Sequence, residues 1–168
     1  MRRLLDGLYT ACGALAALFM VAILIVVLAA IGTRLAGVSF PGAADYAGYC
    51  MAAASFLALA YTFRRGAHIR VTLVVQRLTG RARRIAELLA TGLACGLAWY
   101  FAWYSFRLVR FSRMLGDVSQ GQDATPLWIP QLAMVVGTAV LAVALTDHLV
   151  SVLRGGDIAL GEDEGKEA

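Results

Sequence analysis

Four long stretches of this chain contain no charged residue, and they constrain the fold more than any other feature. They cover residues 7–33, 46–63, 88–106 and 124–146. A helix needs about 20 mostly apolar residues to cross a bilayer core about 30 Å thick, and all four stretches approach or exceed that length. We therefore predict an all-α membrane protein with four transmembrane helices in a single domain, residues 1–155, with spans at about 8–33, 46–63, 87–112 and 127–150.

Composition supports lipid as the solvent of these helices. The 168-residue chain is 60% hydrophobic and 15% charged, whereas soluble domains carry about 25% charged residues. A net charge of +4 would fit a nucleic-acid binder, but the basic residues interrupt apolar stretches and do not line one soluble face. We therefore expect no nucleic-acid partner. The three cysteines stand alone in apolar stretches, which predicts small packing residues within helices.

The basic residues are divided unequally between the two ends of the predicted helices. An even number of spans places both termini on one side, which holds Arg2, Arg3, Arg64, Arg65, Arg70, Arg77, Arg81, Arg83, Arg84, Arg154 and Lys166. The other side holds Arg34, Arg107, Arg110 and Arg113. Because cytoplasmic segments are enriched in Lys and Arg, we predict that both termini and the middle segment face the cytoplasm. We expect residues 156–168 to form a disordered acidic tail on that side.

The middle segment, residues 64–87, is too basic for the lipid interior. One stripe at helical spacing is apolar: Val71, Val74, Val75 and Leu78. A second stripe is basic: Arg70, Arg77, Arg81 and Arg84. Such a pair of stripes predicts a helix lying in the membrane interface and contacting anionic lipid, although alternation at residues 69–73 would also fit a short strand. His68 fits a pH-sensing or ligand-binding role, but we favour an ordinary loop histidine.

Three carboxylates lie near predicted helix ends. Asp45 is expected to cap the start of the second span. Glu87 is expected to open the third, where the helix dipole favours a negative charge. Asp147 ends the fourth, where the dipole is unfavourable. We therefore expect Asp147 to have a basic neighbour, supplied by an arginine of the middle segment.

The opposite side of the membrane has two features of its own. The third span ends in aromatic residues at 99–106, which is typical of an interfacial belt. Residues 116–131 then form a short polar loop, in which Pro130 suits the first turn of the fourth helix and Trp128 an interfacial anchor. The loop fits a structural turn and a docking surface for a periplasmic partner equally well. Its candidate docking residues are Asp117, Ser119, Gly121, Asp123, Pro126, Trp128, Pro130 and Gln131.

Small residues predict close helix contacts. Gly92 and Gly96 form a GxxxG pattern in the third span, and the second span carries several alanines. These contacts fit either internal packing or a second chain, and a larger partner suits a bundle this small. No buried charge of the kind that marks ion sites lies inside a span, and no catalytic or metal-binding motif is present. We therefore expect no catalytic residue, no metal site and no cofactor.

Two motifs between the four spans carry a family resemblance. The cytoplasmic motif consists of Arg64, Arg65, Gly66, His68, Ile69 and Arg70. The periplasmic motif consists of Ser119, Gly121, Pro126, Leu127, Trp128, Pro130 and Gln131. Together, in this topology, they resemble the small membrane subunit, DctQ type, of the tripartite ATP-independent periplasmic (TRAP) transporters. The resemblance extends over residues 8–155.

The resemblance implies a three-part uptake system in the bacterial inner membrane. A periplasmic binding protein captures an organic acid such as a dicarboxylate, and a large membrane subunit carries it inward by sodium symport. The small subunit has no transport site and braces the large one. Two alternatives remain from the residues themselves. One is a homo-oligomeric scaffold or assembly factor, and the other is a membrane enzyme that uses His68 or His148 with Asp147.

Overall fold

The computed structural model describes residues 2–65, 81–122 and 124–154. In this part of the chain the secondary structure consists of four helices: α1 (Arg2–Leu35), α2 (Ala43–Arg64), α4 (Arg81–Leu115) and α5 (Trp128–Leu153). Each covers one of the predicted spans, and each is long and apolar enough to cross a membrane. The prediction of an all-α protein with four long apolar helices is confirmed. The predicted interfacial segment at residues 66–80 lies outside the described residues.

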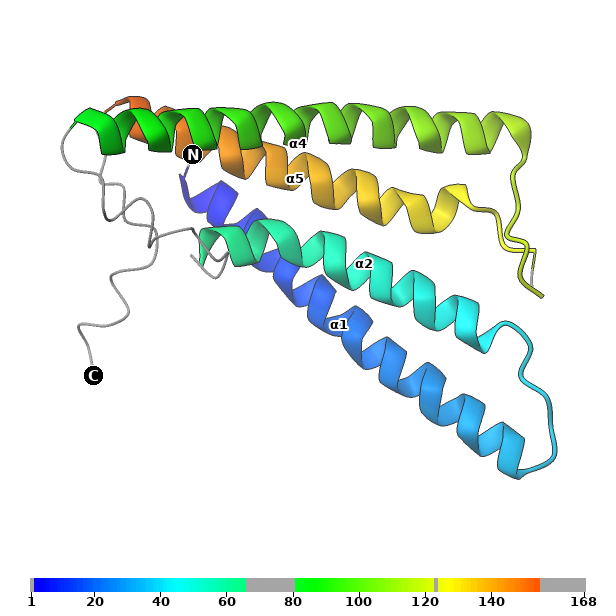
Figure 1. The fold of residues 1–168 in the computed structure, drawn as a ribbon. Helices are drawn as coiled ribbons and strands as arrows, with labels where there is room; N and C mark the ends of the chain where they lie inside the picture. The colour runs from blue at the N-terminus through cyan, green and yellow to red at the C-terminus, as the bar shows by residue number, and fades with distance from the viewer. Residues whose placement is uncertain (1, 66–80, 123, 155–168) are drawn as a thin grey trace, which may run out of the picture.

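The helices stand side by side in the order α1, α2, α5, α4 (Figure 1). The packed pairs are α1 with α2, α2 with α5, and α5 with α4. The helices converge at the end where α1 begins and α5 ends, whereas α1 leans away from α4 toward the opposite end (Figure 1). We call these the terminal end and the loop end. Such an open row gives each outer helix only one neighbour along most of its length.

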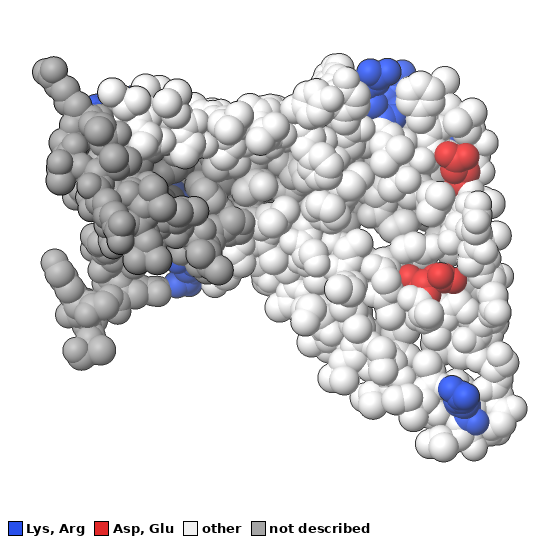
Figure 2. Space-filling view, in the orientation of Figure 1, with Lys and Arg blue, Asp and Glu red and all other residues white. Residues whose placement is uncertain are grey.

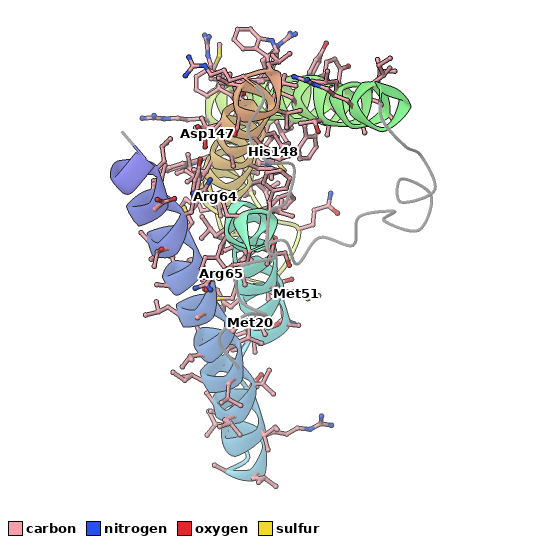
Figure 3. All side chains as sticks on the ribbon, turned by 90° about the vertical axis from the view of Figure 1, so that its left-hand side faces the viewer. Met20, Met51, Arg64, Arg65, Asp147 and His148 are labelled. Atoms are coloured by element: carbon pink, nitrogen blue, oxygen red, sulfur yellow. The ribbon has the colours of Figure 1, made fainter. Side chains whose placement is uncertain are left out.

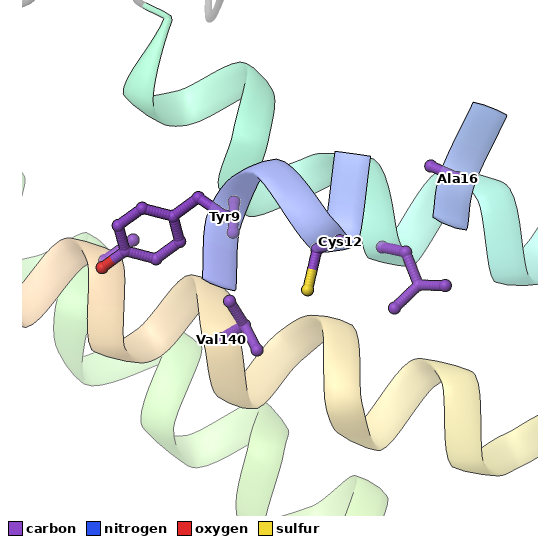
Figure 4. Packing of buried hydrophobic residues seen from close by; sticks show 7 residues of the cluster. Tyr9, Cys12, Ala16 and Val140 are labelled. Carbon is purple, nitrogen blue, oxygen red and sulfur yellow. The ribbon is translucent and has the colours of Figure 1, made fainter. Parts of the chain in front are cut away.

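At the terminal end, α1 is held by a seam of buried residues. Tyr9, Cys12 and Ala16 lie at spacings of three and four, so they share one face of α1. Figure 4 shows them directed toward α2 and α5, where the seam is completed by Leu57, Ala60, Val140 and Ala144. Beyond this seam α1 has no buried residue from Met20 to Leu35. Its second half therefore meets lipid or another protein.

A second seam joins α4 to α5. The buried residues of α4 repeat at alternating spacings of three and four: Cys95, Ala98, Ala102, Ser105, Val109 and Ser112. That period is the seam of a coiled coil, and every member is small or β-branched, so the two backbones can approach closely. Cys95 and Ala98 pack on Ala142 and Leu145 of α5. Burial of Cys12 and Cys95 agrees with the expected packing role of the cysteines.

The central pair, α2 and α5, approach each other closely at Gly137. A Cβ atom at that position would overlap the backbone carbonyl group of Phe56. On the other side of α2, a Cβ at Gly13 of α1 would lie 2.8 Å from Cγ of Tyr61. These contacts need glycine because a side chain would push the helices apart.

Two expected helix starts are wrong. Helix α2 begins at Ala43, after Gly42 with its positive φ of 78°, so Asp45 lies in the first turn and is not the N-cap. Helix α4 begins at Arg81, so Glu87 lies beyond its first turn. In both cases the helix extends past the uncharged run, because backbone hydrogen bonding continues into the polar region where charged side chains are solvated.

Candidate functional site

An arginine at the terminal end connects three helices. The Arg64 guanidinium, on the last residue of α2, donates through Nη2 to Asp6 Oδ1 of α1. Its Nη1 lies 3.5 Å from Asp147 Oδ2 of α5, and its Cζ lies 5.3 Å from the ring centroid of Tyr9. Figure 3 shows Arg64 between α1 and α5, with Asp147 beside it. We call Asp6, Tyr9, Arg64 and Asp147 the Arg64 cluster.

This cluster confirms the basic neighbour expected for Asp147. An arginine suits the position because its planar guanidinium can face two carboxylates and a ring at once. The side chain of Arg64 is 31% exposed and that of Asp147 is 33% exposed, so water screens both only in part. The cluster therefore fixes the start of α1 against α2 and α5 where the apolar seam ends.

Beside the cluster, a hollow of about 230 Å³ opens between α1 and α2. Its walls are formed by six residues of the two helices: Asp6, Tyr9, Thr10, Tyr61, Arg64 and Arg65. The Arg65 guanidinium lies 5.4 Å from the ring centroid of Tyr61, which holds it against the wall. Both a carboxylate and guanidinium groups therefore face the same small space.

The two histidines give no support to the enzyme alternative. His148 packs edge-on against Phe63, with ring centroids 5.7 Å apart. His68 lies outside the described residues, as do Gly66, Arg70 and Arg77 from the predicted basic site. Within the described residues, no group of three His, Cys, Asp or Glu side chains is placed to hold a metal ion.

At the loop end, the polar connection between α4 and α5 is an ordered turn. Val118 and Pro126 form an isolated antiparallel bridge. Ser119 N donates to Thr125 O at 2.8 Å, and Leu127 N donates to Asp117 O at 3.0 Å. Helix α4 ends before Gly116, which has a φ of 67°. Asp117 N then donates back to Ser112 O at 2.9 Å, the bond that closes a Schellman motif.

This turn rests on the start of α2. The Asp45 carboxylate lies so close to Gly121 that a side chain there would overlap it.

Trp128 begins α5, and Arg113 of α4 lies 5.6 Å from its ring centroid, while Pro130 falls in the first turn as expected. Gln131 Oε1 is buried and has no hydrogen-bond partner among the described residues. Asp123, the remaining predicted docking residue, lies outside the described residues.

The outward face of α4 is open. A Cβ at Gly92 or Gly96 would meet no described atom within 4 Å, so the GxxxG pattern makes no helix contact within the described part of the chain. The aromatic residues are also exposed, Trp103 by 63% and Tyr100 by 61%. Helix α4 continues past them to Leu115, and Phe101 stacks on Phe56 near the middle of α2, with centroids 6.3 Å apart; their expected place in an interfacial belt stays a prediction.

The sequence prediction brought together only part of this arrangement. Arg64 and Arg65 were predicted as a pair at the membrane surface, and the structure adds Asp6 and Tyr9 from α1 to them. The sequence does contain a signal for Asp6 and Tyr9. Asp6 immediately precedes the first apolar run, and Tyr9 lies three positions after Asp6, on the same face of the helix. Of the remaining predicted residues, Arg81 begins α4 and Arg84 is exposed near that start.

The comparisons with known proteins agree with this arrangement. A family model for the tripartite ATP-independent periplasmic transporters, DctQ component, matches residues 23–155, which include all of α2, α4 and α5. No curated protein matches the chain. Members of this family are inner-membrane components and not enzymes, and they work with a large membrane subunit and a periplasmic binding protein. With four apolar helices and a family match over most of its length, the chain belongs to the DctQ component family of the TRAP transporters.

Proposed function

We propose that this chain is the small permease subunit that braces the large transport subunit as a fixed scaffold. The observation that carries this proposal is the open row of helices. Its outer members, α1 and α4, expose apolar side chains that a closed four-helix bundle would bury, such as Leu24, Leu93 and Leu97. A row with two open outer helices offers a long lateral surface to a larger membrane protein.

The distribution of charge favours a scaffold over a transport pathway. Among the described residues, most charged side chains lie near the helix ends; Asp147 and Arg107 lie somewhat deeper, and Asp147 pairs with Arg64. The middle of the face visible in Figure 2 carries no Lys, Arg, Asp or Glu. Ion and substrate pathways through membranes usually need ionisable side chains inside the spans. The transported organic acid and the sodium ions therefore belong, in this proposal, to the large subunit.

The orientation follows from the basic residues. Arg64, Arg65, Arg84 and Arg154 lie at the terminal end, and in the sequence Arg70 and Arg77 fall between α2 and α4. The positive-inside rule places this end in the cytoplasm, where the same residues contact anionic lipid. The loop end then faces the periplasm, and its turn at residues 116–127 is available to the binding protein.

Deletion of this chain tests the bracing role. We expect uptake of the organic acid to be lost, although the large subunit and binding protein are present and the binding protein still captures substrate. Gly92→Leu and Gly96→Leu should weaken co-purification of the large subunit because they fill an open face of α4. Gly48→Leu adds the same side chain at another open position, on α2, and serves as the control.

Two results would contradict this proposal. Uptake that survives the deletion would show that the large subunit needs no brace. Purification of this chain only with copies of itself would favour the homo-oligomeric scaffold, because the open Gly92 face could then be covered by a second copy.

A separate experiment tests the periplasmic turn. The Asp117→Lys and Asp123→Lys double substitution reverses two charges in this segment. If the turn contacts the binding protein, docking measured by surface plasmon resonance should weaken at low salt while the membrane complex stays intact. Unchanged docking would leave the turn with only its structural role of joining α4 to α5.

A further inference from the structure

The hollow between α1 and α2 lies near the polar ends of two candidate membrane spans. Arg64 is the last residue of α2, and the apolar candidate span of α1 begins at Leu5, so both walls change from apolar to polar at this level. Headgroups and glycerol ester groups occupy the layer just outside the hydrocarbon core. Exposed apolar side chains such as Leu18 and Met51 continue along both helices beyond it, where acyl chains can lie against them.

Charges of both signs line the hollow. Arg64 is engaged by the carboxylates of Asp6 and Asp147. Arg65 adds a second guanidinium on the wall, held over the Tyr61 ring. Two guanidinium groups and one carboxylate therefore line the hollow, a second carboxylate contacts Arg64 from outside its walls, and the Asp6 side chain is still 51% exposed. A ligand with only a negative charge would be attracted by Arg65 and repelled by Asp6.

We propose that this hollow binds the headgroup of a zwitterionic phospholipid that carries a phosphate and a primary ammonium group. Arg65 binds the phosphate, because a guanidinium donates two parallel hydrogen bonds to phosphate oxygens. Asp6 accepts a hydrogen bond from the ammonium group through the side of its carboxylate that faces the hollow. This site differs from the diffuse contact of the basic segment with anionic lipid. The proposed lipid site requires only that the chain lies in the membrane. It does not depend on the proposal that the chain braces a transporter.

Native mass spectrometry of the purified chain in detergent tests the site. Phosphatidylethanolamine and phosphatidylglycerol with identical acyl chains are added separately, and the bound fraction is measured for each. The unmodified chain should retain phosphatidylethanolamine more strongly. Arg65→Gln should reduce this retention about fivefold, the effect expected of one basic residue near a lipid headgroup. Arg154→Gln removes a basic residue at the same end but outside the hollow, and it should have no effect.

Further variants separate binding from folding. Arg65→Gln leaves the pair between Asp6 and Arg64 in place, and its thermal midpoint is measured beside its lipid retention to show that the variant stays folded. Arg65→Lys restores the charge and should recover part of the retention. Asp6→Asn should reduce retention of phosphatidylethanolamine while leaving that of phosphatidylglycerol equal or higher. Equal retention of the two lipids by the unmodified chain, or equal effects of Arg65→Gln and Arg154→Gln, would overturn the proposal.

Discussion

At the scale of the residue, Arg64 has the largest number of charged partners in the described structure. It holds Asp6 and Asp147 from two other helices and covers the ring of Tyr9. Removing it leaves Asp6 and Asp147 without the ion-pair partner that they share, and a charge left uncompensated costs more than the pair contributed. We expect Arg64→Met to destabilise the chain by about 1–2 kcal/mol, a modest amount because water reaches the cluster. The thermal midpoint in detergent measures this effect.

The matched control is Arg154→Met, which removes an arginine at the same end without an ion pair among the described residues. Asp6→Asn in the Arg64→Met background should restore part of the stability, because only one carboxylate then remains charged. Equal midpoints for the Arg64 and Arg154 variants would show that the cluster does not hold α1 in place.

At the scale of the element, close packing of α2 on α5 depends on Gly137. A methyl group there would overlap the Phe56 carbonyl, and backbone cannot move aside as a flexible side chain can. We expect Gly137→Ala to cost about 1–3 kcal/mol, as overpacking does elsewhere. Gly96→Ala is the control, since its added methyl group meets no described atom within 4 Å. The thermal midpoints of the two variants in detergent measure this difference. Equal midpoints would show that α2 and α5 are not in tight contact at Gly137.

The helices could be predicted from the sequence, but their lateral order could not. A charged residue inside hydrocarbon is costly, so uncharged runs mark the four spans directly. Faces that pack and faces that meet lipid are equally apolar, so the pattern does not separate them. The small residues illustrate this limit, because Gly137 lies at a helix contact while Gly92 and Gly96 point outward. The basic neighbour of Asp147 could be predicted, because a carboxylate near the negative end of a helix dipole needs a positive charge beside it.

At the scale of the whole molecule, the open row follows from where the buried residues stop. The fully buried seam of α1 includes Tyr9, Cys12 and Ala16, and beyond Phe19 the helix keeps α2 as its packed neighbour but has only half-buried and exposed residues. The seam of α4 continues to Ser112 and keeps that helix beside α5 over most of its length. One outer helix therefore diverges and the other does not, which gives the asymmetric outline in Figure 2.

Disulfide cross-linking of the isolated chain tests this shape. With the three native cysteines replaced by alanine, cysteines at Gly13 and Tyr61 should form a disulfide on oxidation, because these positions are in contact. Cysteines at Ile31 and Leu108, in the outer halves of α1 and α4, should not, because the two helices diverge toward that end and form no packed pair. A closed four-helix bundle would bring such outer positions together and allow the second disulfide, which requires Cα atoms about 4.4–6.8 Å apart. Formation of that disulfide as readily as the first would show that α1 folds back onto α4, and the lateral surface proposed for the large subunit would then be closed.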